Sequence, residues 1–462
     1  MTESTTESTF ERSTIRAFRF IRCEFDTAHG EARLVYAFDD GPELTETIRI
    51  PGAPFVLDNA RTAAVKQALR LLHLIAGVSY YKAAVPPEIR IESYDIDAGT
   101  AAFLSEVYEN GLGEFAYRNG LQLRGKITFP VEKSVATSIA PTVAPTMGLR
   151  QHALVAIGGG KDSLVSIEAL RVAGISQTVT WIGSSPLIRA CAERTGLPTL
   201  NISRSLAPEL FEMNKQGALN GHIPVTAVNS AILALAALLQ GADQVVFSNE
   251  RSASYGSLIP GTGEVNHQWS KGWQFERDFA THLKQHVAAD LNYYSLLRPF
   301  SELAVARLFA RSDRYDAHFS SCNRNFHILG ERPTQRWCGV CPKCQFVFLA
   351  LAPFMSKPRL LNIFGRNLLD QPEQAAGFDA LLEYREHKPF ECVGEGVESR
   401  AAMAALAGSP SWREDALVER FAEEIRPQLD PASLAMAPLL VPSTEHGIPP
   451  AVWGALRAHF GA

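Results

Sequence analysis

The sequence has few of the features that mark an exported or membrane-bound protein. Its first residues, MTESTTESTFERST, contain neither the basic nor the apolar segment of a signal peptide, so we expect a disordered tail over residues 1–14. The longest apolar stretch, Val225 to Leu239, contains Thr226, Asn229 and Ser230 and is shorter than the roughly 20 residues that cross a bilayer. We therefore expect a cytoplasmic protein with no membrane partner.

Basic residues are also scarce relative to what a nucleic-acid-binding protein needs. Forty-four Lys and Arg against 49 Asp and Glu give a net charge of −5, and no Lys/Arg-rich run is present, so we expect no nucleic-acid partner. The seven cysteines are odd in number and unevenly spread, which without an export signal favours free thiols and metal ligation over disulfides. No internal repeat is found. With 462 residues, 46% of them hydrophobic, the chain can bury two or three domains.

Residues 15–130 predict an N-terminal α+β domain. Apolar and polar residues alternate between residues 16 and 50 in three runs, which is typical of three antiparallel strands. A helix follows from about Leu57 to Ile75, because apolar residues recur there on one side. Residues 131–150 have no hydrophobic period and contain two prolines, so they predict a linker.

Residues 151–356 change to alternating strands and helices, and 357–462 predict a mostly helical C-terminal region. The alternation is typical of right-handed crossovers in a doubly wound parallel sheet, whose ligands bind at the carboxyl ends of the strands. Three of the expected helices end at glycine. The expected strands are Leu154–Ile157, Val179–Ile182, Thr199–Ile202 and Gln244–Phe247, with helices at about 163–173, 186–195 and 225–240.

A glycine-rich turn, Gly158-Gly159-Gly160-Lys161-Asp162-Ser163, joins the first of these strands to the first helix. Glycine permits positive φ and lets backbone N–H groups approach an anion, which the helix N-terminus also attracts. A Walker A loop requires more residues between its glycines, and a dinucleotide fingerprint requires a third glycine at another position. The turn therefore predicts a phosphate cradle, and an ordinary tight turn with an exposed Lys–Asp pair is the alternative.

The turn resembles the S-G-G-x-D-S loop of the PP-loop ATP pyrophosphatases. These enzymes cut ATP between its α and β phosphates and pass AMP to an oxygen atom of the substrate. The resemblance implies an adenine nucleotide alpha hydrolase-like fold, with ATP held by the glycines and Ser163, Lys161 neutralising phosphate, and Asp162 serving Mg²⁺. Gly158 stands where the family has serine, so one hydroxyl contact is lost while the backbone cradle remains.

Two further segments follow strands whose carboxyl ends would meet the same edge of the sheet. WIGSS contributes Gly183, and SNERSAS contributes Asn249, Glu250, Arg251 and Ser252. These residues are placed for ribose, metal or phosphate contacts. A loop ion pair between Glu250 and Arg251 is the alternative.

Four cysteines have the spacing of a metal site. Cys338, Cys341 and Cys344 form C-x-x-C-x-x-C, and Cys322 lies 16 positions upstream, which predicts a closed structural zinc site. An iron–sulfur cluster or unligated thiols are the alternatives, although the fourth cysteine of the ferredoxin pattern is missing. The segment also resembles the zinc segment of the 7-cyano-7-deazaguanine synthases, PP-loop enzymes that lack counterparts of residues 1–130 and 357–462.

The loop HKPFECVGEG carries candidate acid–base groups. Cys392 would be a reactive thiolate if a cation lowered its pKa, and Lys388 is the candidate cation. His387 lies on the same loop, and His267, in EVNHQWSKGW, is a candidate partner from the nucleotide-binding domain. A solvated loop with a partly buried cysteine is the alternative.

The order of these features resembles the MurL family, the ATP-dependent UDP-N-acetylmuramoyl-L-alanyl-L-glutamate epimerases of peptidoglycan synthesis, over nearly the whole chain. The resemblance implies conversion of a terminal L-Glu to D-Glu, with ATP consumed to AMP and diphosphate. Adenylation would neutralise the carboxylate and make the α-proton more acidic. An amide- or nitrile-forming PP-loop ligase and a non-catalytic nucleotide sensor are the alternatives.

Overall fold

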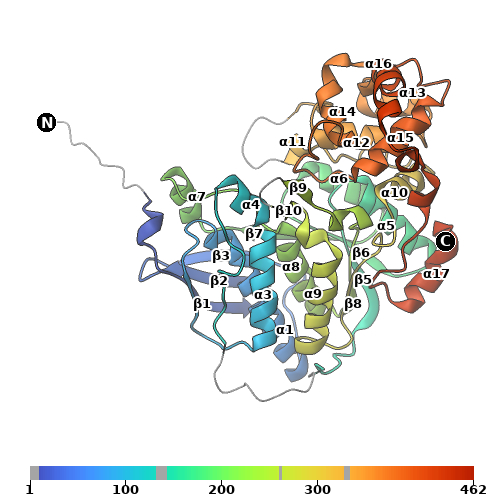
Figure 1. The fold of residues 1–462 in the computed structure, drawn as a ribbon. Helices are drawn as coiled ribbons and strands as arrows, with labels where there is room; N and C mark the ends of the chain where they lie inside the picture. The colour runs from blue at the N-terminus through green and yellow to red at the C-terminus, as the bar shows by residue number, and fades with distance from the viewer. Residues whose placement is uncertain (1–9, 132–142, 260–262, 327–332, 462) are drawn as a thin grey trace. The chain divides into compact units, whose positions relative to one another are not determined.

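The computed structural model describes residues 10–131, 143–259, 263–326 and 333–461, and its elements are labelled in Figure 1. The chain divides into two compact units. The first comprises Met1–Arg150, Asn201–Val245 and Asp278–Asn292, and the second comprises Gln151–Leu200, Val246–Arg277 and Tyr293–Ala462. Both contain helices and strands, so the mixed α/β class is confirmed.

Three antiparallel strands lie side by side in the first unit (Figure 1). They are β1 (Ala17–Asp26), β2 (Glu31–Phe38) and β3 (Leu44–Arg49), and their pairing confirms the strands predicted from the alternating pattern. β4 (Glu88–Ile91), which was not predicted, pairs parallel with β1. β3 pairs antiparallel with residues 203–205 of β7 (Thr199–Ser205), a strand predicted only as part of a parallel sheet.

The interior of the first unit contains a cluster of neutral aromatic side chains. Phe18, Phe20 and Tyr36 of the strands and His73 of α1 (Asn59–Ala76) are fully buried. Tyr36 stacks on Tyr80 with 4.7 Å between ring centroids, and His73 Nε2 lies 3.0 Å from the Val35 carbonyl oxygen. Because the polar atoms have partners, burying the rings stabilises the unit without leaving a polar group unsatisfied.

Helix α8 (Val225–Gln240) packs against α1 within the first unit. Arg61 Nη1 of α1 donates to the Leu238 carbonyl at 2.9 Å. The sequence predicts α8 inside the domain of residues 151–356, whereas its contacts group it with the N-terminal elements. The reason is physical: α8 is apolar on nearly all sides, so it can also cover the apolar side of α1.

A parallel strand pair positions the glycine turn in the second unit. β5 (Arg150–Ala156) and β6 (Gln177–Ile182) pair parallel, and α5 (Lys161–Val172) connects them, which confirms the predicted crossover. The order of neighbouring strands is β11-β8-β5-β6, where β8 is Ala242–Phe247 and β11 is Asn292–Ser295. α6 (Pro186–Thr195) ends at Gly196 in the left-handed conformation, as predicted.

After β11, the described residues of the second unit contain helices and no further strand (Figure 1). The helices are α10 (Glu302–Phe309), α11 (Asn323–Phe326), α12 (Pro342–Leu351), α13 (Lys357–Phe364), α14 (Ala375–Leu382), α15 (Gly396–Ala407), α16 (Ala416–Arg420) and α17 (Pro450–Phe460). The remaining α-helices and β-strands among the described residues are α2 (Val78–Tyr81), α3 (Ala98–Gly111), α4 (Gly113–Arg118), α7 (Pro208–Lys215), α9 (Trp273–His286), β9 (Ser257–Ile259) and β10 (Gly263–Val265).

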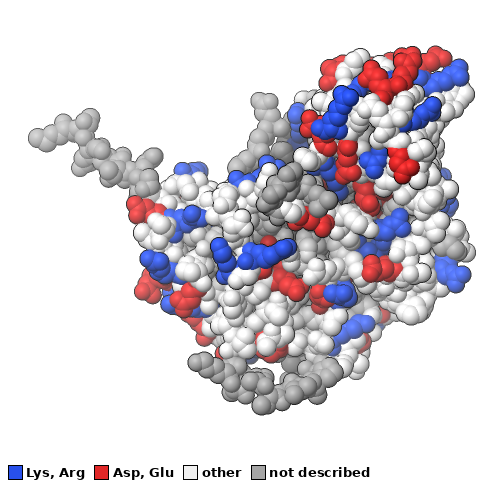
Figure 2. Space-filling view, in the orientation of Figure 1, with Lys and Arg blue, Asp and Glu red and all other residues white. Residues whose placement is uncertain are grey.

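Two predicted segments fall partly outside the described residues. These are positions 1–9 of the tail and 132–142 of the linker. Among the helices that the structure describes, none combines the length and the apolar character needed to cross a membrane. Figure 2 shows Lys and Arg interspersed with Asp and Glu on the face that it draws, with no long stripe of one sign there.

Candidate active site

The glycine turn after β5 favours glycine by its conformation at one position and by close packing at another. Gly159 has φ +79°, and a Cβ on Gly160 would lie 2.5 Å from Ser321 Oγ. Gly158 is exposed, and a Cβ there would meet nothing within 4 Å. A serine would therefore fit at position 158, so packing does not explain why this chain departs from the PP-loop pattern there.

The turn presents a row of unsatisfied backbone donors. The N–H groups of residues 158 to 162 have no hydrogen-bond partner within the described part of the chain, and no side chain caps α5. Free N–H groups at a helix N-terminus attract anions, because the helix dipole adds to their hydrogen-bonding capacity. A phosphate group fits this cradle.

A buried charge cluster adjoins the turn. The Lys161 ammonium is fully buried and pairs with the carboxylates of Asp162 and Glu302, and Lys343 Nζ lies 3.5 Å from Glu302 Oε1. Burial lowers the pKa of Lys161, but the two carboxylates outweigh burial and hold the pKa above its ordinary value. Burial raises the pKa of Glu302, but the two lysines bring it down to about 2. The neighbouring opposite charges therefore favour the charged forms of Lys161 and Glu302.

Glu250, which follows β8, interacts electrostatically with the charged groups of this cluster. Its side chain is buried, and burial together with the charges of Glu302 and Asp162 raises its pKa to about 7. Three carboxylates near one another destabilise each other's charged form, and a divalent cation would relieve that repulsion. The donor set of Asp162, Glu250 and Glu302 therefore fits Mg²⁺, which prefers oxygen ligands.

The other predicted nucleotide contacts form hydrogen bonds within the protein. Gly183, at the end of β6, has φ +96°, and a Cβ there would meet nothing within 4 Å. The guanidinium of Arg251 donates to backbone carbonyls, so the alternative pairing with Glu250 is not formed. The hydrogen bonds are Asn249 Nδ2 to Ser295 Oγ at 3.0 Å, Ser252 Oγ to Glu398 Oε2 at 2.6 Å, and Arg251 Nη1 and Nη2 to Val441 and Leu439 carbonyls at 3.4 Å.

Cys392 lies beside a lysine that the sequence analysis missed. Lys271 Nζ, at the end of a 3₁₀ turn (Trp269–Lys271), lies 3.1 Å from Cys392 Sγ. Burial raises the pKa of Cys392, but Lys271, a hydrogen bond from His267 and the charge of Lys343 together lower it to about 5. Burial lowers the pKa of Lys271, whereas Cys392 and Glu250 raise it above its ordinary value. These shifts favour the thiolate of Cys392 and the ammonium of Lys271.

His387 and Lys388, the other two candidates of this loop, lie elsewhere. Both line a hollow of about 470 Å³, together with Ser257 and Arg385. Lys388 Nζ lies 3.5 Å from the Tyr255 carbonyl oxygen, and His387 is exposed. The cation beside Cys392 is therefore Lys271 and not Lys388, whereas His267 does lie beside Cys392 as the predicted pairing requires.

Three residues of this site carried no recognisable sequence signal. Glu302 follows Ser301, the N-cap of α10, and reads as an ordinary first-turn acid. Lys343 lies between two cysteines of the metal motif, and Lys271 lies in a short polar stretch between two tryptophans. Each becomes part of the site only through contacts between distant segments, which local patterns do not encode.

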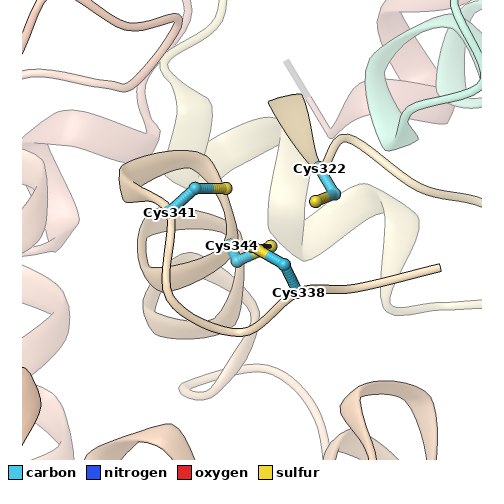
Figure 3. A group of neighbouring side chains, drawn as sticks. All are labelled: Cys322, Cys338, Cys341 and Cys344. Atoms are coloured by element: carbon cyan, nitrogen blue, oxygen red, sulfur yellow. Dashed lines mark hydrogen bonds between the residues drawn. The ribbon is translucent and has the colours of Figure 1, made fainter. Parts of the chain in front are cut away.

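The four predicted cysteines come together in the second unit. Figure 3 shows their sulfur atoms pointing toward one another, from the segment before α11, the loop before α12 and α12 itself. All four Sγ atoms lie within 4.8 Å of one another, and Cys338 and Cys344 Sγ are 3.7 Å apart. Tetrahedral zinc with Zn–S distances of about 2.3 Å separates its sulfurs by roughly 3.8 Å. The four thiols are arranged to hold one metal ion.

Comparison with known proteins gives consistent matches along the chain. A family model described as the MurL N-terminal domain matches residues 9–296, and one described as the MurL C-terminal domain matches residues 318–436. A protein of Xanthomonas oryzae pv. oryzae is 71% identical over 453 residues, covering 98% of this chain and 99% of its own length. Proteins of a Micromonospora species and Salinispora tropica are each 42% identical, over 94% and 88% of this chain and 96% and 89% of their own lengths. All three are named UDP-N-acetyl-alpha-D-muramoyl-L-alanyl-L-glutamate epimerase.

Proposed function

Since the chain belongs to the MurL family, we propose that it is an ATP-dependent epimerase of peptidoglycan synthesis. It converts the terminal L-glutamate of UDP-N-acetylmuramoyl-L-alanyl-L-glutamate to D-glutamate in the cytoplasm. The reaction passes through an acyl-adenylate and releases AMP and diphosphate. The near full-length similarity to proteins named as epimerases supports the substrate and the stereochemical change.

The observation that carries the ATP dependence is the row of unpartnered N–H groups at residues 158 to 162. These donors suit the phosphates of ATP, and Lys161 supplies a fixed positive charge beside them. Asp162 would hold Mg²⁺, and the charge of Asp162 also acts on nearby Glu250. When bound, the ion would offset the negative charge of the phosphates. The contacts of ATP with Gly183, Asn249, Arg251 and Ser252 remain predictions.

ATP is needed because a free carboxylate resists removal of its α-proton. Deprotonation would place a second negative charge on the same group, whereas the mixed anhydride formed with AMP gives a singly charged enolate. Epimerisation then removes a proton from one face of Cα and returns one to the other face. Cys392 and His267 are the proposed proton-transfer residues, and His387 and Lys388 remain weaker candidates because they lie away from the thiol.

The test is incubation of the protein in D₂O with ATP and the L-glutamyl substrate. We expect AMP, diphosphate and a D-glutamyl product that carries deuterium at Cα, with no conversion when ATP is omitted. Conversion without ATP would contradict the proposed adenylation step. AMP formation without a change of configuration would favour a ligase instead.

For the four cysteines we propose a structural zinc site. Four thiolates satisfy tetrahedral zinc completely and leave no position for water, so the ion takes no part in the reaction. α12 carries both Cys344 and Lys343, and Lys343 pairs with Glu302. Zinc would therefore fix the first turn of α12 and, through it, the position of one cation of the buried charge cluster.

A further inference from the structure

Cys392 and Lys271 meet from segments more than one hundred positions apart in the chain. Lys271, His267 and Lys343 face the thiol, and Cys392, Glu250 and Asp162 face the Lys271 ammonium. Both residues keep only a minor part of their surface exposed. Moving two charges out of water costs more free energy than packing two apolar side chains of similar size, so stability alone does not account for this pair.

The backbone that carries Lys271 is held in place by a buried arginine. Arg298 is 2% exposed, and its guanidinium donates to the carbonyl oxygen of Lys271 and, at 2.7 Å, to that of Glu250. Glu276 pairs with the same guanidinium at 2.9 Å. Arg298 therefore fixes the segment from which Lys271 reaches the thiol, and it ties that segment to the loop of Glu250.

We propose that Lys271 is the positioning residue that keeps Cys392 as a thiolate, and that this thiolate removes the α-proton of the adenylated glutamyl group. The inference rests on the proposed function. The Cα–H bond breaks, its electron pair moves into the activated carbonyl group as an enolate, and the proton forms the S–H bond of Cys392. A second acid protonates the opposite face of the enolate, and the proton on sulfur then passes to solvent.

Lys271 would speed proton removal by increasing the fraction of Cys392 that is a thiolate. An ordinary cysteine with a pKa of about 8.5 is only a few per cent thiolate at pH 7, whereas a pKa near 5 makes almost every molecule reactive. Loss of the ammonium should therefore slow proton removal by about 30-fold at pH 7. The deficit should shrink as the pH rises, because hydroxide then removes the thiol proton that Lys271 no longer displaces.

The experiment measures hydrogen–deuterium exchange at Cα of the L-glutamyl substrate against pH, with AMP formation measured in the same samples. Wild-type exchange should fall below about pH 5, where the thiolate is protonated. Cys392→Ala should reduce exchange by at least about 10³-fold and still form AMP, because adenylation does not use the thiol. Lys271→Met should move the acid limb of the exchange profile upward by more than about two pH units, and Lys271→Arg should restore most of that shift.

Lys357→Met is the matched control, because it removes a lysine of the same unit that pairs with Asp415 at 2.5 Å. Its acid limb should stay where the wild type has it. Ultraviolet absorbance of the thiolate, taken as the difference between each protein and the same protein with Cys392→Ala, should titrate with the same midpoints. This readout does not depend on turnover.

Two results overturn the inference: wild-type exchange in Cys392→Ala, or an unmoved acid limb and thiolate titration in Lys271→Met. Neither result touches adenylation, which AMP formation reports separately. If the wild type formed no AMP but still exchanged the α-proton through Cys392, the proposed ATP dependence would fail and the role of the thiolate would stand.

Discussion

The first unit buries histidine and tyrosine side chains as neutral, hydrogen-bonded groups, whereas the second unit buries lysine, arginine and glutamate side chains as a network of charges. His73 and Tyr108 of the first unit each bond to backbone carbonyls, at 3.0 and 2.6 Å. In the second unit Lys161, Glu302 and Arg298 are all at most 2% exposed, and each is held by groups of opposite charge.

This contrast between neutral and charged buried groups distinguishes side chains that stabilise the fold from side chains that take part in binding or catalysis. A neutral group that keeps its hydrogen bonds adds packing area at little electrostatic cost. Buried charges are expensive to desolvate, so a large network of them indicates a site where charge is used. The first unit also buries the carboxylate of Glu46, which pairs with Arg204, and this pair offers a direct test of the distinction.

The largest effect should come from the four-cysteine metal site of the second unit. We expect about one zinc per chain, and Cys341→Ser should lose the metal, because structural zinc contributes on the order of 10 kcal/mol. Thermal unfolding followed by tryptophan fluorescence should shift strongly, since all six tryptophans belong to the second unit. Cys23→Ser, in the first unit, is the control and should keep the zinc. Absence of zinc from protein purified without chelator would contradict the assignment.

The next largest effect should be a loss of turnover when one carboxylate of the charge cluster is removed. Asp162→Ala should reduce turnover by at least about 10³-fold, equivalent to about 4 kcal/mol, because the proposed Mg²⁺ ligand is lost. Unfolding should change little, since Lys161 keeps Glu302 as its partner. Asp40→Ala removes an exposed carboxylate of the first unit and should leave turnover unchanged. Full activity of Asp162→Ala would break the link between buried charge and catalysis.

The ion pair of the first unit should affect stability and not activity. Glu46 is fully buried, and Arg204 Nε donates to its Oε1 at 2.7 Å. Glu46→Gln leaves the guanidinium without a counter-charge, which should cost about 3 kcal/mol in urea unfolding. Turnover per folded molecule should stay at the wild-type value. Glu43→Gln breaks an exposed pair with Arg22 and should change neither quantity.

Sequence reasoning succeeded where neighbouring residues decide the structure. Alternation gave β1 to β3, glycine marked the ends of α6 and α8, and cysteine spacing gave the four thiols that meet. It failed where distant segments decide. Lys271 has no local signal, and Lys388 was preferred beside Cys392 only because it is near in sequence. The packing of α8 on α1 could likewise not be predicted, because the sequence of an apolar helix does not show which element it packs against.

The smallest expected effect concerns protonation of the neutral interior of the first unit. His73 is fully buried, its Nδ1 lies 2.8 Å from Tyr94 Oη, and burial lowers its pKa to about 4 although the bond to the Val35 carbonyl opposes the shift. In the unfolded chain the histidine has a pKa near 6.5, so between about pH 6.5 and pH 4 the unfolded chain binds a proton that the folded unit does not bind. The contribution of His73 is therefore complete above about pH 6.5 and is lost as the pH falls toward 4. Between pH 7.5 and pH 5 the wild type should lose about 2 kcal/mol more stability than His73→Gln, a difference in which all other titrating groups cancel. Amide hydrogen exchange in β1 to β3 measures it, and equal losses in the two proteins would mean that the buried ring is already charged.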